Sequence, residues 1–98
     1  MTALRERALA SLQSVPSLPK HVRIQYDVVR QAFAVLAPEK VFWPNEISLD
    51  ILRYCDGEST VGHIIAKLAF DYDGDQEIVA ADVIAFLQEW SDKLLVKL

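Results

Sequence analysis

The 98-residue sequence contains one cysteine, Cys55, and two histidines, His21 and His63. A single cysteine cannot form an intramolecular disulfide, and none of the three residues has a second Cys or His at the spacing of a metal site. Three scattered glycines leave no glycine-rich loop for phosphate. Because catalysis by a nucleophile or a metal needs converging groups, the sequence predicts a binding protein that is not an enzyme and holds no cofactor.

One acidic loop requires a separate test for calcium. Asp71, Asp73 and Asp75 occupy the first, third and fifth positions expected of an EF-hand loop. The sixth position is Gln76, where the sharp turn requires glycine, and the twelfth is Asp82, which is shorter than the bidentate glutamate. The loop is therefore predicted to be an exposed turn whose last aspartates cap a helix, with no metal bound.

Long hydrophobic runs are also absent. Uncharged stretches such as residues 31–38 are far shorter than the ~20 apolar residues of a membrane span. The first residues do not follow the basic, apolar, small-residue order of an export leader, and the lone cysteine suits a reducing compartment. With 52% hydrophobic residues, we expect a single domain with one core, located in the cytoplasm and without a membrane partner.

Positive charge is scarce in the second half of the chain. Residues 56–92 carry nine Asp or Glu against the single base Lys67, whereas residues 1–55 carry seven Lys or Arg against five acids. An acidic surface repels phosphate backbones, so nucleic acid is not an expected partner. A basic peptide or protein would be favoured.

The N-terminal residues carry a helical pattern. Within residues 3–14, Leu4, Ala8, Leu9 and Leu12 share one helical face, and two prolines follow closely. We predict an amphipathic helical arm and linker over residues 1–19, followed by a domain over 20–98. The apolar stripe needs a cover, which is either the arm's own domain or a second subunit in a homodimer.

From residue 21 the pattern predicts three strands. Val22, Ile24 and Tyr26 alternate with polar residues, residues 31–37 are almost wholly apolar, and a turn at residues 37–40 leads into a short strand over 41–43. This order predicts an antiparallel meander whose second strand is central.

Three helices are predicted after the strands. Asn45 would cap the first, which runs to Asp56 before Gly57 and buries Ile47, Ile51, Tyr54 and Cys55. Thr60 would cap the second, and the third would cover residues 76–92, with Val79, Val83, Phe86, Leu87 and Trp90 at helical spacing. The fold class is therefore α+β.

A set of short motifs between residues 21 and 96 resembles the PqqD family of pyrroloquinoline quinone (PQQ) biosynthesis proteins. The motifs are Phe33 to Glu39 (FAVLAPE), Asn45, Ile51-Leu52, Cys55-Asp56-Gly57, Thr60-Val61, Ile64-Ile65, Leu68, Asp82-Val83 and Phe86-Leu87. The resemblance implies a winged-helix-like domain, with a three-stranded antiparallel sheet followed by three helices. It also implies a recognition element for precursor peptides of ribosomally made, post-translationally modified products (RiPPs).

The resemblance further implies a peptide chaperone. Such a domain binds the precursor peptide PqqA as an added strand and presents it to the radical S-adenosylmethionine (SAM) enzyme PqqE. The implied peptide-binding residues lie on the third strand and the third helix. They are Val41, Phe42, Trp43, Asp82, Phe86 and Trp90.

The sequence departs from the family pattern at three places. Lys40 and Lys93 stand where the family usually has glycine, and Pro44 stands where it usually has leucine. A recognition domain for a different modified peptide would share the same fold and edge. The alternative from another class is a winged-helix nucleic-acid-binding protein, and a purely structural dimer is a third.

Overall fold

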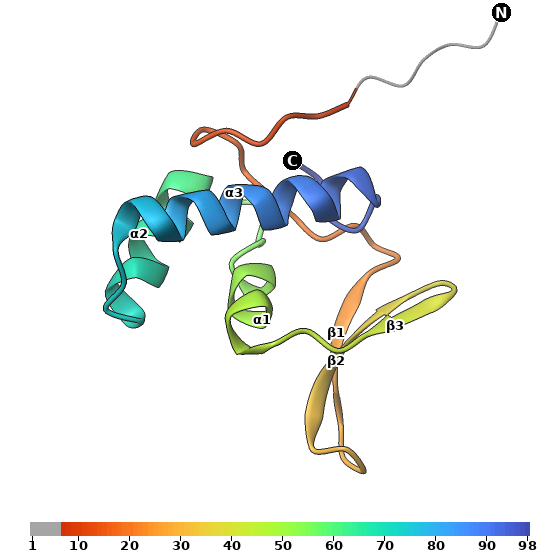
Figure 1. Cartoon of the computed structure of the whole chain (residues 1–98). Coiled ribbons are helices and arrows are strands. Elements are labelled where there is room, and N and C mark those ends of the chain that lie inside the picture. Colours follow the sequence, from red (N-terminus) through yellow and green to blue (C-terminus); the bar gives the residue numbers. More distant parts are fainter. Residues whose placement is uncertain (1–6) are drawn as a thin grey trace, which may run out of the picture.

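A computed structural model of the chain describes residues 7–98, and it places a small sheet before three helices (Figure 1). The strands are β1 (Arg23–Asp27), β2 (Ala32–Ala37) and β3 (Lys40–Phe42). They pair antiparallel in the order β1-β2-β3. The α+β class, the meander and the central position of β2 are therefore confirmed, and β3 begins and ends one residue earlier than predicted.

The pleat of the sheet divides its side chains between two faces. Val35 of β2 lies opposite Ile24 on one side and Phe42 on the other, and it is fully buried against the helices. The neighbouring residue Leu36 lies opposite Val41, so both point to the outer face. The sheet thus has an inner face that joins the core and an outer face without a helix over it.

Helix α1 (Glu46–Arg53) begins where the sequence predicts and ends earlier. The Asn45 side chain accepts a hydrogen bond from the Ser48 N–H at 2.8 Å, which confirms the predicted cap. The predicted end at Asp56 is wrong. The Asp56 carboxylate accepts hydrogen bonds from two backbone N–H groups of the loop that follows. These bonds hold Asp56 in a turn and not in a helix.

The predicted buried side of α1 is wrong at one position. Ile47 is 48% exposed, whereas Leu49 and Leu52 of the same helix are buried. Because α1 has only eight residues, a small rotation of the helix about its axis changes which apolar residues reach the core.

Helices α2 (Val61–Asp71) and α3 (Gln76–Asp92) have the predicted caps. The Thr60 and Asp75 side chains accept hydrogen bonds from backbone N–H groups in the first turns of these helices. The two helices pack against each other, and their buried side chains share one core with those of α1 and β2. The fully buried apolar side chains of this core are Val35, Leu52, Val61, Ile64, Ile65, Leu68, Val83 and Leu87.

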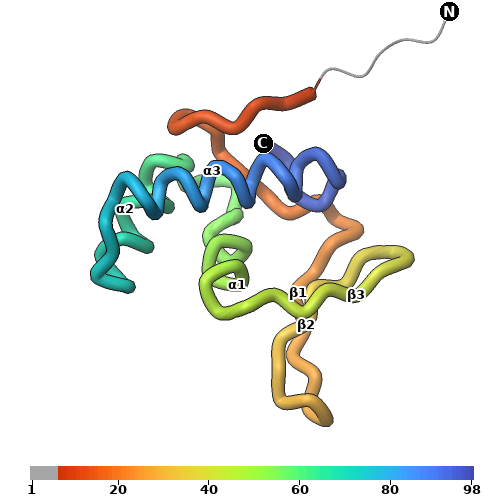
Figure 2. The backbone as a smooth tube through the Cα atoms, in the orientation of Figure 1, coloured from red at the N-terminus to blue at the C-terminus, as the bar shows by residue number. Residues whose placement is uncertain are grey.

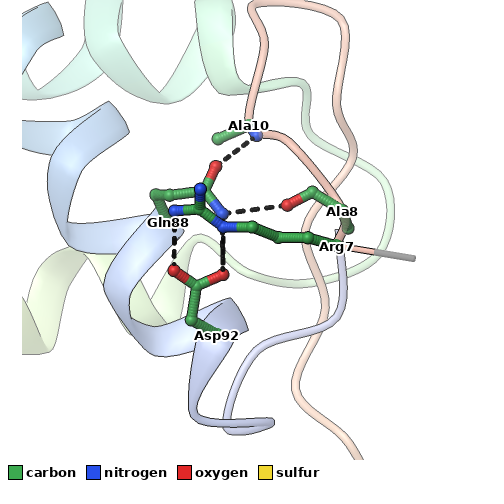
Figure 3. Close-up of polar contacts among 5 residues, drawn as sticks. All are labelled: Arg7, Ala8, Ala10, Gln88 and Asp92. Carbon is green, nitrogen blue, oxygen red and sulfur yellow. Dashed lines mark hydrogen bonds and ion pairs between the residues drawn. The ribbon is translucent and has the colours of Figure 1, made fainter. Parts of the chain in front are cut away.

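The helix predicted over residues 3–14 is wrong for the described part of that segment, which is irregular; its first four residues lie outside the described residues. The Gln88 side chain accepts a hydrogen bond from the Ala10 N–H and donates one to the Ala8 carbonyl, both at 2.9 Å (Figure 3). In an α-helix each N–H donates to the carbonyl four residues earlier, whereas these two backbone groups bond to a side chain of α3.

The arm is also held by charge. The Arg7 guanidinium makes two hydrogen bonds to the Asp92 carboxylate, at 2.9 and 2.8 Å (Figure 3). Leu9 and Leu12 of the arm remain exposed. These two leucines would form the surface for a homodimer through the arm, which stays a prediction.

Residues after the arm join the domain through backbone hydrogen bonds. The Val61 N–H donates to the Ser14 carbonyl at 2.8 Å, and Ser17 exchanges two hydrogen bonds of 2.8 Å with Lys97. Pro16 between them is fully buried. The segment predicted as a linker thus lies against both the helical layer and the C-terminal residues, and Figure 2 traces its path.

Two side chains, Tyr72 and Cys55, have raised pKa values that make the stability of the fold depend on pH in the alkaline range. The Tyr72 hydroxyl donates to the Asp50 carboxylate, and this hydrogen bond, with some desolvation, raises the pKa of Tyr72 to about 12. Burial raises the pKa of the Cys55 thiol from 9.0 to about 12. In both cases the fold favours the protonated form.

We expect the free energy of unfolding to fall as pH rises from about 9 to 12. The unfolded chain releases these two protons at lower pH than the folded chain, so their contribution is complete below pH 9 and lost as pH approaches 12. Urea unfolding at pH 7 and pH 11 measures this difference. Tyr72→Phe should reduce the difference, and a difference that this substitution leaves unchanged would contradict the explanation.

Candidate functional site

Three of the predicted site residues form an aromatic cluster between β3 and α3. The Phe42 ring lies 5.3 Å from the Trp90 ring, centroid to centroid, and Phe86 stacks on Trp90 at 5.1 Å. Trp90 is 7% exposed, and the other two are half-buried. Trp90 therefore belongs mainly to the core, whereas Phe42 and Phe86 present ring surface beside the strand.

Asp82 lies at the N-terminal side of this cluster. It precedes Phe86 by one turn on the same face of α3, since residues four apart are neighbours on a helix. Its side chain is exposed. The structure therefore places Asp82 next to the cluster in the direction of the α3 N-terminus, outside the ring contacts.

The other two predicted site residues point to the opposite face of the sheet. Val41 is 53% exposed and Trp43 is 42% exposed. Successive side chains of a strand alternate, so both lie on the face away from Phe42. The structure thus separates the predicted set into an inner group beside α3 and an outer pair.

The hydrogen-bonding pattern determines which backbone groups of β3 remain open. Ala37 and Lys40 close a two-residue turn, so this pair is hydrogen-bonded. In an antiparallel ladder the next pair, Leu36 and Val41, is not bonded and the following pair, which includes Phe42, is bonded again. The N–H and C=O of Val41 therefore point away from β2, toward the open edge.

At position 44 the backbone faces β2 and not the open edge. Continuing the register would place position 44 opposite Phe33, with its backbone facing β2. Proline has no N–H to donate, so the ladder cannot extend that far and β3 ends at Phe42. The missing N–H is on the β2 side, so Pro44 removes no donor from the open edge at Val41.

Two departures from the family pattern meet at one end of the aromatic cluster. Lys40 and Lys93 line a hollow of about 360 Å³ together with Glu39, Phe42 and Leu95. Lys93 also forms an ion pair of 4.0 Å with a glutamate one turn earlier in α3. This end of the site thus carries two ammonium groups and two carboxylates, those of Glu39 and Glu89, and Asp82 lies at the other end.

The predicted helix cap in the acidic loop is confirmed at Asp75, and Asp71 is the last residue of α2. Asp75 caps α3, and the Asp71 carboxylate accepts a hydrogen bond from the Tyr54 hydroxyl at 3.2 Å. Among residues 7–98 no three His, Cys, Asp or Glu side chains are placed to hold a metal ion. None of the helices in this part of the chain is long and apolar enough to span a bilayer.

The structure adds Arg30 and Leu36 to the surroundings of the outer pair. The Arg30 guanidinium lies 4.6 Å above the Trp43 ring, a cation–π arrangement. Leu36 lines the same hollow as Val41. The strand alternation predicts the position of Leu36, but no sequence signal indicates that Arg30, in the turn after β1, reaches Trp43.

Comparisons with known proteins identify the family of the chain. Residues 32–96 match the family model of coenzyme PQQ synthesis protein D, PqqD. A PqqA binding protein of Rhodopseudomonas palustris strain HaA2 is 46% identical over 83 residues, which are 85% of this chain and 81% of that protein.

Two solved structures share the fold. One is the solution structure of the PqqD part of Methylobacterium extorquens PqqCD, described as a functional, stand-alone RiPP recognition element; its TM-score is 0.77 at 34% identity, covering 94% of this chain and 97% of that one. The other is PqqD from Xanthomonas campestris, with a TM-score of 0.57 at 33% identity, covering 90% and 98%. The chain described here belongs to the PqqD family.

Proposed function

We propose that this chain binds a PqqA-type precursor peptide by strand addition along β3. It would hold the peptide for the radical SAM enzyme PqqE and catalyse no step itself. The observation that carries the proposal is the open Val41 edge beside the Phe42, Phe86 and Trp90 cluster. The name of the 46% identical relative, PqqA binding protein, supports the choice of peptide.

The edge supplies the backbone half of recognition. An added strand would exchange hydrogen bonds with the N–H and C=O of Val41, and no strand within residues 7–98 pairs with β3 on that side. Because backbone groups are common to all peptides, this pairing gives affinity without selecting a sequence.

The aromatic cluster supplies side-chain selection on the inner face. A guest residue opposite Phe42 would point toward α3 and lie against the exposed parts of Phe42 and Phe86. An apolar guest side chain at this position would be removed from water. Lys40 at one end and Asp82 at the other could each pair with a charged side chain of the peptide.

The helices favour a peptide over nucleic acid as the partner. Helix α3 contains no Lys or Arg, and the one base of α2, Lys67, lies 3.9 Å from Asp71. A helix that enters a DNA groove needs positive charge to offset the phosphates. Together with the single buried cysteine, this supports a role among cytosolic proteins and peptides.

Titration of unlabelled PqqA peptide of Rhodopseudomonas palustris HaA2 into isotope-labelled protein tests the proposal. We expect backbone amide shifts concentrated at residues 40–44 and along α3. Absence of binding, or shifts confined to β1 and α2, would contradict it. A precursor peptide from another RiPP pathway, titrated in parallel, should shift the same amides only weakly; stronger binding of that peptide would identify this chain as the recognition domain of a different product.

A further inference from the structure

The outer face of the sheet carries a hollow next to the proposed peptide edge. Its volume is about 480 Å³. Val41 of β3 and Trp43, the residue after this strand, line one side of it, while Ala34 and Leu36 line it from β2. Neither Val41 nor Trp43 reaches the aromatic cluster on the inner face, so neither side chain would contact a peptide in the proposed inner groove.

The pleat of an added strand connects this hollow to the same peptide. Guest side chains alternate between the two faces, and those on the outer face would lie about 5 Å from the side chains of Val41 and Trp43. A peptide paired to β3 therefore cannot contact the inner cluster alone, because every second side chain extends over the outer hollow.

The positive charge of Arg30 at the hollow favours a peptide with an acidic side chain. Arg30 covers the Trp43 ring, and within residues 7–98 its guanidinium forms no ion pair with a carboxylate. Asp27, the one acidic residue that lines the hollow, accepts a hydrogen bond from the Arg30 backbone N–H at 2.9 Å. The guanidinium above Trp43 is thus placed to meet an acid from outside the chain.

We propose that the outer hollow is the second half of the peptide site and that it selects a carboxylate-bearing guest segment. One outward guest side chain, apolar, would pack opposite Val41, and a second, Asp or Glu, would lie beside Trp43 and pair with Arg30. The two outward positions are two residues apart in the guest, since that is the period of one strand face. This inference rests on the proposed strand addition and specifies its ligand.

Binding of the PqqA peptide to three variants tests the inference. We expect Trp43→Ala to weaken binding roughly fivefold and Arg30→Gln about threefold, with Trp43→Phe close to the unchanged protein. Arg23→Gln is the matched control, because it removes the same charge from the outer face on strand β1. It should leave the affinity unchanged.

A second set of peptides locates the guest carboxylate. Each Asp or Glu of the peptide is replaced in turn by its amide and titrated against the unchanged protein and Arg30→Gln. One replacement should weaken binding to the unchanged protein and have no further effect on Arg30→Gln. If the peptide binds but neither Arg30→Gln nor Trp43→Ala changes affinity, the outer-face inference is wrong and strand addition stands. If the peptide does not bind the unchanged protein, the proposed function is wrong.

Discussion

Replacing Val41 with proline is expected to weaken PqqA binding by roughly tenfold to a hundredfold. The substitution removes the one N–H that β3 presents to the open edge, so the guest carbonyl opposite it would be buried without a donor. The fold should be retained, because proline is tolerated on an edge strand where its nitrogen faces away from the ladder.

The choice of position makes this test specific. Phe42 is the neighbouring residue, but its N–H faces β2, so a proline there would break the sheet itself. Val41→Ala keeps the N–H and removes most of the side chain, and it is the matched control. We expect calorimetric titration to show a loss of less than tenfold for alanine. Equal affinity of the proline variant and the unchanged protein would exclude backbone pairing at this edge.

Replacing Trp90 with alanine is expected to lower the free energy of unfolding by about 3–5 kcal/mol. Trp90 is 7% exposed and contacts both Phe42 and Phe86, so its removal leaves a cavity between the sheet and α3. A loss of this size is a large share of the 5–15 kcal/mol that is typical for a small domain. The substitution would also remove the contact between Phe42 and Trp90 of α3.

The second tryptophan provides the control for this substitution. Trp43 is 42% exposed on the outer face, so Trp43→Ala should lower the free energy of unfolding by only about 1 kcal/mol. Urea unfolding of both variants measures the difference. A loss for Trp90→Ala as small as that for Trp43→Ala would contradict the position of Trp90 between the two layers.

Much of the fold could be predicted from the sequence because local signals agree with the final packing. The Asn45 and Thr60 caps act within one turn of the chain, and both are confirmed. The apolar run of β2 marks a strand with a neighbour on each side. The boundaries of α3 are those predicted, since its apolar spacing continues through seventeen residues.

The arm could not be predicted because its conformation depends on distant residues. Residues 3–14 have a helical pattern on their own, yet Gln88, about eighty positions later, forms hydrogen bonds with the backbone of Ala8 and Ala10. A tertiary contact of this kind overrides a weak local propensity. Nothing within residues 3–14 indicates it.

The location of the candidate site could be predicted from the sequence, but the residue that joins its outer pair could not. The resemblance selects β3 and α3, and the structure brings Phe42, Phe86 and Trp90 together there. Strand alternation alone implies that Val41 and Trp43 face the other way. The partner of that outer pair, Arg30, comes from a turn whose path depends on the whole sheet.

Hydrogen exchange at the Val41 amide tests strand addition most directly. In the free protein this N–H points to the open edge and should exchange rapidly, whereas the Phe42 N–H is already in the ladder with β2. Saturation with PqqA should slow exchange at Val41 by at least about tenfold and leave the Phe42 amide little changed. A peptide that binds without slowing exchange at Val41 would show that it does not pair with β3.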